Sequence, residues 1–175
     1  TRGQKESIMP RTTFLLTEIN VLRAYFRILF LPMGQNIDHD HPLAKTLMDL
    51  KTFFSLLGLL SIFAAAICRF KKNRLLSFCV LLFFLMLSVE LLIPQSDVIM
   101  EHRLYLPMAA FAVFLTASLA GFFEKNIKIA FFILSAAALV FSGLVYQRNF
   151  VWKNELTLWN DAVMKSPNKA RPYNN

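Results

Sequence analysis

Long apolar runs alternate with short polar segments over most of this chain of 175 residues. Four runs, at residues 52–68, 75–93, 104–123 and 129–146, each approach the roughly 20 residues that a helix needs to span a bilayer. Glycine, alanine and serine recur within them, and small residues let helices approach one another closely in lipid. The pattern therefore predicts a packed bundle of four membrane-spanning helices.

A different period marks residues 12–31, ahead of these runs. Apolar side chains recur there at spacings of three and four, on a face formed by Leu15, Ile19, Leu22, Phe26 and Leu29. Because Arg23 and Arg27 line another face, the segment is typical of an amphipathic helix that lies at a membrane surface. The alternative is a core helix of a soluble subdomain.

A polar segment at residues 35–51 places Asp38, His39, Asp40 and His41 in succession. Carboxylate and imidazole groups are ordinary metal ligands, but this spacing matches no strong metal-binding motif. We therefore predict no tightly bound metal ion in this segment, and the sequence indicates no cofactor.

The second and third apolar runs are joined by a polar link that carries Glu101, His102 and Arg103, while Glu90 lies within the run before it. Ionisable groups in or beside lipid are costly, so they need partners or a function. The simpler interpretation is an ion pair that holds two helices together, or a solvated loop.

Basic residues are densest in the two other links between apolar runs, RFKKNR and EKNIK. Short, strongly basic loops remain in the cytoplasm. We therefore predict that residues 1–51, the link at 94–103 and the C-terminal tail share the opposite face, which is periplasmic, extracellular or luminal. Residues 38–41 can then meet residues 101–103.

Composition supports the membrane assignment, because 56% of the residues are hydrophobic and 18 are Phe, values that soluble domains seldom reach. Topology and anionic lipid explain the formal net charge of +8 better than nucleic acid does. Cys68 and Cys79 are interpreted as packing thiols, not as a disulfide. The chain begins with Thr and has no signal-peptide pattern, so we expect a piece of a longer protein.

The tail at residues 147–175 has a pattern of its own. Apolar side chains recur there at helical spacing, at Trp152, Leu156, Trp159 and Val163. This helix should stop at Ser166 and Pro167, and a second helix should start near Ala170. Such a pair looks like the first unit of a tetratricopeptide array, which must continue further to bury its faces. A single amphipathic surface helix is the alternative.

These patterns together predict an all-α membrane protein with three parts. Residues 1–51 form an outer-face segment with an interfacial amphipathic helix, and residues 52–147 form four transmembrane helices. Residues 148–175 begin a tetratricopeptide-repeat domain.

Several stretches also carry a resemblance to a known family. QNIDHDHPL, DVIMEHRLYLP and WKNELTLWNDAVMKSPNKARPYNN stand in this order along the chain. They resemble the transmembrane and tetratricopeptide-repeat protein O-mannosyltransferases and their bacterial relatives, which are similar to membrane glycosyltransferases of the GT-C class. The resemblance implies a polyprenyl-phosphate-linked sugar donor and an acceptor, a protein hydroxyl, on the outer or luminal face. It also implies an inverting displacement in which a carboxylate base activates the acceptor.

The resemblance also implies roles for residues of this face. A cation is needed where charge builds on the leaving phosphate, and Arg103 suits that position through its fork of donors. Glu101 or Glu90 would hold Arg103, His102 would form a hydrogen bond nearby, and Asp38 would complete the substrate-binding set. The catalytic acidic residue of this class lies in an earlier loop, so no catalytic residue is assigned within the chain.

Two other functions remain open. A non-enzymatic membrane anchor that displays a repeat array would bind a protein partner through that array. A fragment of a transporter or channel is disfavoured, because the apolar runs lack internal repeats and the polar residues cluster at one face.

Overall fold

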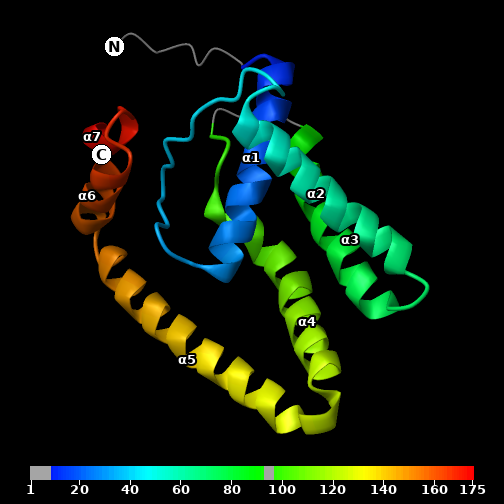
Figure 1. Cartoon of the computed structure of the whole chain (residues 1–175). Coiled ribbons are helices and arrows are strands. Elements are labelled where there is room, and N and C mark those ends of the chain that lie inside the picture. The colour runs from blue at the N-terminus through cyan, green and yellow to red at the C-terminus, as the bar shows by residue number, and fades with distance from the viewer. Residues whose placement is uncertain (1–8, 93–96) are drawn as a thin grey trace.

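The computed structural model describes residues 9–92 and 97–175, which form helices joined by loops, with no β-strand among these residues. Figure 1 shows them in chain order: α1 (Arg11–Phe30), α2 (Leu50–Arg69), α3 (Arg74–Ser88), η1 (Val89–Leu92), η2 (Glu101–Leu104), α4 (Tyr105–Phe122), η3 (Glu124–Asn126), α5 (Ile127–Val151), α6 (Glu155–Lys165) and α7 (Arg171–Asn174). The predicted all-α class is thus confirmed for the described residues.

The connections between the helices fall at two ends of the molecule (Figure 1). The turn between α2 and α3 and the turn η3 between α4 and α5 lie at one end, which we call the turn end. The loop at 31–49, the link from 97 to 104 and the tail lie together at the other, the loop end. This is the grouping that the basic links predict. Which side of a membrane the loop end occupies stays a prediction.

Three helices are long and apolar enough to cross a membrane: Leu50–Arg69, Glu101–Phe122 and Glu124–Val151. The chain is therefore an integral membrane protein, and three of the four predicted spans are confirmed in length and composition. The remaining one, α3, has only 15 residues. Together with η1 it measures about 30 Å at the usual rise of the two helix types, which is about the thickness of the hydrocarbon core. It stays a prediction.

Helix α1 packs against the other helices with a face that differs from the predicted one, while its predicted place at a membrane surface stays a prediction. Val21 is 0% exposed and Tyr25 is 1% exposed. Of the predicted apolar face only Leu29 is buried, whereas Leu15 is 38% exposed. The core around α1 is formed by Phe14, Val21, Tyr25, Ile28, Leu29, Phe83, Leu87, Val98, Ile99, Leu104 and Ala110.

Polar side chains explain why a different face of α1 is buried. The Asn20 amide donates to the Thr52 hydroxyl at 2.8 Å and accepts from the Ser55 hydroxyl at 3.0 Å, both on α2. The Thr17 hydroxyl accepts from the backbone N–H of Ala44 at 3.0 Å, in the loop before α2. Hydrogen bonds of this kind hold helices together where the solvent is apolar. Asn20 and Thr17 therefore mark contacts of α1 with α2 and the loop before it, whereas the charged Arg23 and Arg27 lie on the exposed face.

Helix α5 departs from the predicted packed bundle. Helix α3 lies between α2 and α4 and packs against both, but α5 diverges from α4 beyond their shared turn (Figure 1). Only 6% of its most apolar window is buried, against 22% for α2. A Cβ added at Gly143 would meet no atom within 4 Å. Gly143 therefore makes no close helix contact within the described residues, and only Ala130, near the start of α5, is buried among them.

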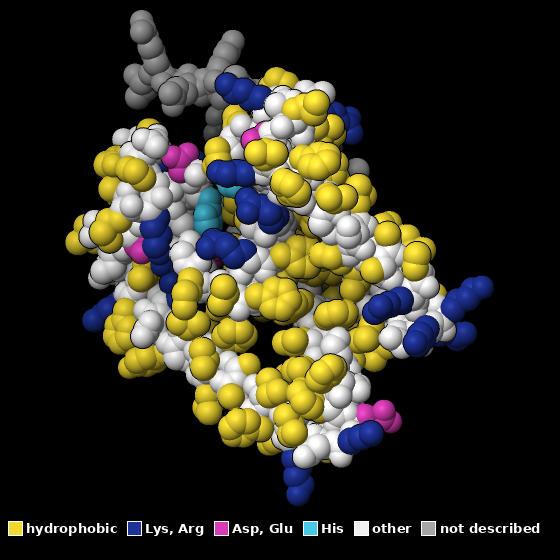
Figure 2. All heavy atoms as spheres, in the orientation of Figure 1, with side chains coloured by type: hydrophobic (Ala, Val, Ile, Leu, Met, Phe, Trp, Pro, Cys, Tyr) yellow, Lys and Arg dark blue, Asp and Glu magenta, His cyan; other side chains and the backbone are white. Residues whose placement is uncertain are grey.

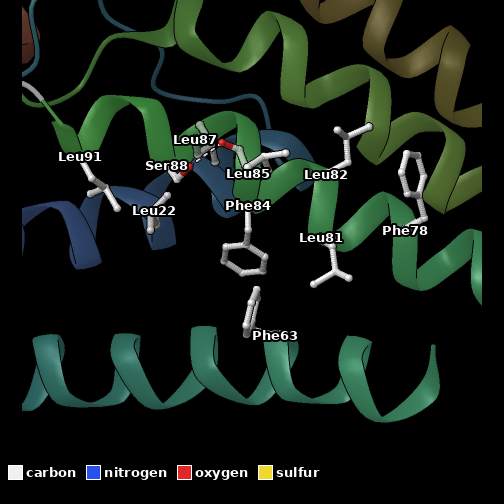
Figure 3. A pocket seen from close by; sticks show the side chains of 10 residues that line it. All are labelled: Leu22, Phe63, Phe78, Leu81, Leu82, Phe84, Leu85, Leu87, Ser88 and Leu91. Atoms are coloured by element: carbon white, nitrogen blue, oxygen red, sulfur yellow. Dashed lines mark hydrogen bonds between the residues drawn. The ribbon is translucent and has the colours of Figure 1, made fainter.

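An apolar cavity of about 530 Å³ lies between α2 and α3. Figure 3 shows Phe63 of α2 and Phe84 of α3, whose rings meet edge to face with centroids 5.6 Å apart, among its lining residues together with Leu22 of α1. Ser88 and Leu91 line it where α3 and η1 approach the loop end. Nearly all of its lining is hydrocarbon, so it suits an apolar chain and no polar ligand.

Candidate functional site

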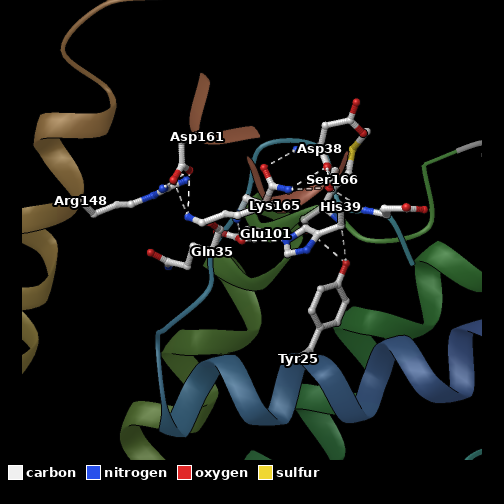
Figure 4. Close-up of polar contacts among 12 residues, drawn as sticks. Tyr25, Gln35, Asp38, His39, Glu101, Arg148, Asp161, Lys165 and Ser166 are labelled. Carbon is white, nitrogen blue, oxygen red and sulfur yellow. Dashed lines mark hydrogen bonds and ion pairs between the residues drawn. The ribbon is translucent and has the colours of Figure 1, made fainter. Parts of the chain in front are cut away.

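The polar groups of the loop end form one connected cluster, which we call the polar junction. It consists of Asn36, Asp38, His39, Asp97, Glu101, Ser166, Lys169 and Arg171. These residues come from the loop after α1, the link before α4 and the tail. The predicted meeting of residues 38–41 with residues 101–103 is therefore confirmed, and the tail joins them (Figure 4).

Ser166 is the centre of the junction and is fully buried. Its hydroxyl donates to the backbone carbonyl of Asp38 at 2.6 Å and accepts from the Asn36 amide at 2.8 Å and the backbone N–H of Asp40 at 3.0 Å. Pro167 follows it, and α6 ends just before it, as the sequence predicts. The residue that ends the helix thus also fastens the tail to the loop.

Two carboxylates and two cations lie beside Ser166. Lys169 donates to Asp38 and also to Asp97 at 3.2 Å, and Arg171 donates to Asp97 at 2.9 Å. Asp38 is only 3% exposed, and a buried carboxylate is tolerated where a cation accompanies it. Asp38 therefore has a structural role, which is to pair with Lys169. Its predicted role in substrate binding stays a prediction.

The pKa of Asp97 reflects the same contacts. Partial burial raises the pKa of this carboxyl, but the hydrogen bonds and charges of Arg171 and Lys169 outweigh burial and hold the pKa below its usual value. Asp97 is therefore ionised at neutral pH, and it ties the link before α4 to the tail.

Within the junction, His39 and Glu101 are the pair whose arrangement is best suited to general acid–base chemistry. The Nε2 atom of His39 lies 2.8 Å from Oε1 of Glu101, which also accepts from the backbone N–H of Asn36 at 2.7 Å. The side chains are 16% and 23% exposed. A carboxylate that holds an imidazole in place is a common arrangement for moving protons. The geometry thus gives Glu101 a partner, His39, that sequence reasoning did not assign to it.

Arg103 lies deeper in the link. Its guanidinium donates to the backbone carbonyls of Val98 at 3.3 Å and Asp97 at 3.4 Å. The Tyr25 hydroxyl of α1 fixes the same link, since it donates to the Met100 carbonyl and accepts from the Met100 N–H, each at 3.1 Å. Arg103 thus contacts two backbone carbonyls at long hydrogen-bond distances and also interacts with the Tyr25 hydroxyl. Its predicted contact with phosphate stays a prediction.

The two remaining predicted site residues contribute less to the junction. His102 is exposed beside Arg103. The backbone of Glu90 lies in η1, but its side chain falls outside the part of the chain that the structure describes. Their predicted roles therefore stay predictions.

A second set of contacts joins α5 to the loop. Asp161 of α6 accepts from Arg148 of α5 at 2.6 Å and from Lys165 at 2.9 Å, and Lys165 also donates to the carbonyl of Gln35 at 2.7 Å (Figure 4). Burial raises the pKa of the Asp161 carboxyl. The hydrogen bonds and charges of Lys165 and Arg148 have the larger, opposite effect, so the pKa lies below its usual value. The tail is thereby anchored at both ends.

Sequence reasoning missed Ser166, Lys169 and Arg171 as partners of the loop. Their only signal was the run SPNKAR beside a site already rich in acids. For metals, the described ranges 9–92 and 97–175 contain no group of three His, Cys, Asp or Glu side chains placed to hold an ion. Asp40 instead accepts from the Asn168 amide at 3.1 Å.

Comparison with known proteins finds two relatives that carry the same name. The chain is 28% identical over 142 residues to protein O-mannosyl-transferase TMTC3 of Homo sapiens, covering 77% of this chain and 16% of the relative. It is 26% identical over 145 residues to the protein of the same name from Mus musculus, covering 77% of this chain and 15% of the relative. No family model and no solved structure matches the chain.

The chain thus spans about a sixth of the length of the curated relatives that it matches. Their similarity covers most of the membrane helices and loops described above, since it extends over 77% of the chain. It confirms that the chain resembles the transmembrane and tetratricopeptide-repeat protein O-mannosyltransferase family, as its sequence motifs indicate.

Proposed function

We propose that this chain is part of a membrane glycosyltransferase that moves a sugar, mannose, from a polyprenyl-phosphate donor to a protein hydroxyl at the loop end. The name of the two relatives, protein O-mannosyl-transferase, supports the choice of mannose as the transferred sugar. The observation that carries the proposal is the polar junction, where loop, link and tail meet directly above the apolar helices. A lipid-linked donor needs this boundary between hydrocarbon and polar groups.

The two halves of such a donor match two features of the structure. The apolar cavity between α2 and α3 reaches Ser88 and Leu91 near the loop end (Figure 3), so it would take the start of the isoprenoid chain. Arg103 in the link would then contact the phosphate. Its guanidinium is a planar, cationic fork of hydrogen-bond donors, so it suits a phosphate leaving group.

The tail has a separate part in the proposal. Leu156 is 80% exposed, Met164 70% and Tyr173 59%, an apolar surface typical of a helix pair that stacks on further repeats. Because the junction fastens this pair to the loop, a repeat array would present its acceptor in a fixed direction. The same surface also fits the alternative, a non-enzymatic scaffold that binds protein through its repeats.

Transfer and binding assays on the full-length protein distinguish these functions. The wild type should transfer mannose from polyprenyl-phosphate mannose to protein, and a protein that folds and binds partners without any transfer would be the scaffold. Arg103→Ala should weaken donor binding by about one to two decades, the cost of about 1.5–3 kcal/mol for a lost charged hydrogen-bond partner. Arg103→Lys should weaken it less.

Arg74 provides the control, because it is an exposed arginine at the turn end. Arg74→Ala should leave donor binding unchanged. Unaltered donor binding by a stably folded Arg103→Ala protein would show that Arg103 serves only to hold the link, through the carbonyls of Val98 and Asp97.

A further inference from the structure

Two arginines of α1 carry charge that the rest of the described chain does not neutralise. Arg23 and Arg27 are exposed and stand one turn apart, so their guanidinium groups share a face of the helix. Among residues 9–92 and 97–175, neither makes an ion pair or a side-chain hydrogen bond. Like charges at this spacing repel each other, which favours an anion between them.

The loop after α1 folds back over both arginines. Gly34 has φ 71, a left-handed conformation that turns the loop there. A Cβ on Gly34 would lie 4.0 Å from both terminal nitrogens of Arg27, so this guanidinium lies beside the loop backbone. Arg27 also stands in the last turn of α1, where a cation offsets the helix dipole. That explanation does not extend to Arg23, which lies a turn earlier.

His41 provides a third group at the same place. Its Nε2 atom is buried and has no hydrogen-bond partner among the described residues. Burial lowers the pKa of His41, and the nearby charge of Arg23 lowers it further. Buried polar atoms without a partner are rare and call for a water, an ion or a ligand. An anion beside Arg23 would accept a hydrogen bond from this nitrogen and would stabilise the protonated ring.

The space-filling view shows how these groups are displayed. In Figure 2, Lys and Arg side chains gather around the histidines in a hollow between the tail and α2. Acidic side chains nearby are already engaged, since Glu101 pairs with His39 and Asp38 with Lys169. The hollow is thus cationic, and it opens at the loop end, at the level where lipid headgroups would lie.

We propose that Arg23, Arg27 and His41 form a binding site for a lipid-borne phosphate group. Two guanidinium forks and an imidazole N–H supply the kinds of donor that phosphate oxygens accept from. The phosphate belongs either to an anionic phospholipid of the bilayer or to a polyprenyl phosphate. The site is separate from Arg103, and it holds whether or not the chain takes part in sugar transfer.

The test uses the purified chain in bilayer nanodiscs. Two probes separate the two sources: phosphatidylglycerol in a phosphatidylcholine background, and a short-chain polyprenyl phosphate in phosphatidylcholine alone. The Arg23→Gln/Arg27→Gln variant should lose at least about tenfold in affinity for whichever probe binds, because two charged donors are removed. His41→Gln should lose less, and binding of a single probe identifies the source.

The control removes the same charge from the turn end, where Lys71 and Lys72 are exposed. Lys71→Gln/Lys72→Gln should keep wild-type affinity. Equal affinity of the wild type and the double arginine variant for both probes, or an equal loss in the lysine control, would overturn the proposal. Arg23→Lys/Arg27→Lys guards against misfolding, because it keeps both charges and should bind with an affinity between wild type and the glutamine variant.

Discussion

The loop end and α5 are held in place by opposite means. At the loop end, residues more than 120 positions apart along the chain are joined by specific hydrogen bonds, such as that from the Ser166 hydroxyl to the backbone carbonyl of Asp38. Helix α5 is fastened only near its two ends, by the η3 turn and by Arg148, and its apolar length is almost bare. Phe131, Phe132 and Leu139 are each more than 70% exposed.

This difference follows from the solvent that each region meets. In lipid an apolar side chain gains little from packing on another, so a spanning helix need not bury its surface to be stable. Polar groups at the membrane boundary must instead find defined partners. The geometry of the loop end is therefore fixed by contacts within the chain. That of α5 is left to lipid or to a partner that packs on it.

The largest effect should come from the buried carboxylate of the junction. Asp38→Ala leaves Lys169 with only Asp97, and it should weaken docking of the tail by about 3 kcal/mol, the low end for breaking a buried ion pair. Proteolysis of the tail tracks the undocked population, so cleavage should accelerate by about a hundredfold. Asp40→Ala is the matched control, because Asp40 is exposed and accepts only from the exposed Asn168. Equal cleavage of both variants would contradict the junction.

Ser166→Ala should have the next largest effect. It removes the acceptor of the Asp40 N–H and the donor to the Asp38 carbonyl, at a cost of about 1–3 kcal/mol for groups left unsatisfied. Thermal unfolding and tail proteolysis should both report the loss. Ser61→Ala, at an exposed serine whose hydroxyl bonds only within its own helix turn, should change stability by less than about 0.5 kcal/mol. A larger loss of stability from Ser61→Ala than from Ser166→Ala would contradict the central role of Ser166 in the polar junction.

Acid should loosen the tail before it affects the helices. The pKa values of Asp97 and Asp161 are lower in the folded protein than the usual value. Such groups contribute stability that is complete above about pH 4 and is lost as pH falls through the lower folded pKa. Tail docking, followed by the distance between spin labels, should therefore hold at pH 5 and weaken progressively below about pH 4. Asp97→Asn should already be weaker at neutral pH and respond less to acid.

The smallest effect is expected on α5. Gly143→Ala adds a Cβ that meets no atom within 4 Å, so stability should change by less than about 0.5 kcal/mol. Ala110→Leu on α4 is the contrast, because Ala110 is 5% exposed within the core and overpacking costs about 1–3 kcal/mol. Thermal unfolding of both variants measures the difference. A strong loss from Gly143→Ala in the full-length protein would reveal a partner that packs on α5.

The sequence predicted most helices because lipid imposes their length. The apolar run at 104–123 corresponds closely to α4, and the stop at Ser166 corresponds to the end of α6. The sequence pattern predicted the wrong buried face for α1, because Asn20 and Thr17 are polar and yet buried against α2 and the loop before it. A periodicity rule assumes that polar side chains face solvent, and in a membrane protein they also join helices.

The site was predictable in part for a similar reason. Clustered acids and imidazoles in two loops, together with the basic turns, placed His39 and Glu101 on one face, and they do meet. Lys169 and Arg171 were not predicted as partners of Asp38 and Asp97 because ion pairing leaves no periodic trace in a sequence. Only the three-dimensional course of α5 brings the tail back to the loop (Figure 1).

The long separation between Ser166 and its partners also sets an order of events during synthesis. The loop that contains Asp38 is made first, and the Lys169 that neutralises it follows after a further 131 residues. At typical elongation rates of about 5–20 residues per second, the loop waits on the order of ten seconds. In that interval all later helices must be inserted with the correct orientation. The contact of Lys169 with Asp38 can therefore form only in a chain whose later helices have been inserted in the orientation that returns the tail to the loop.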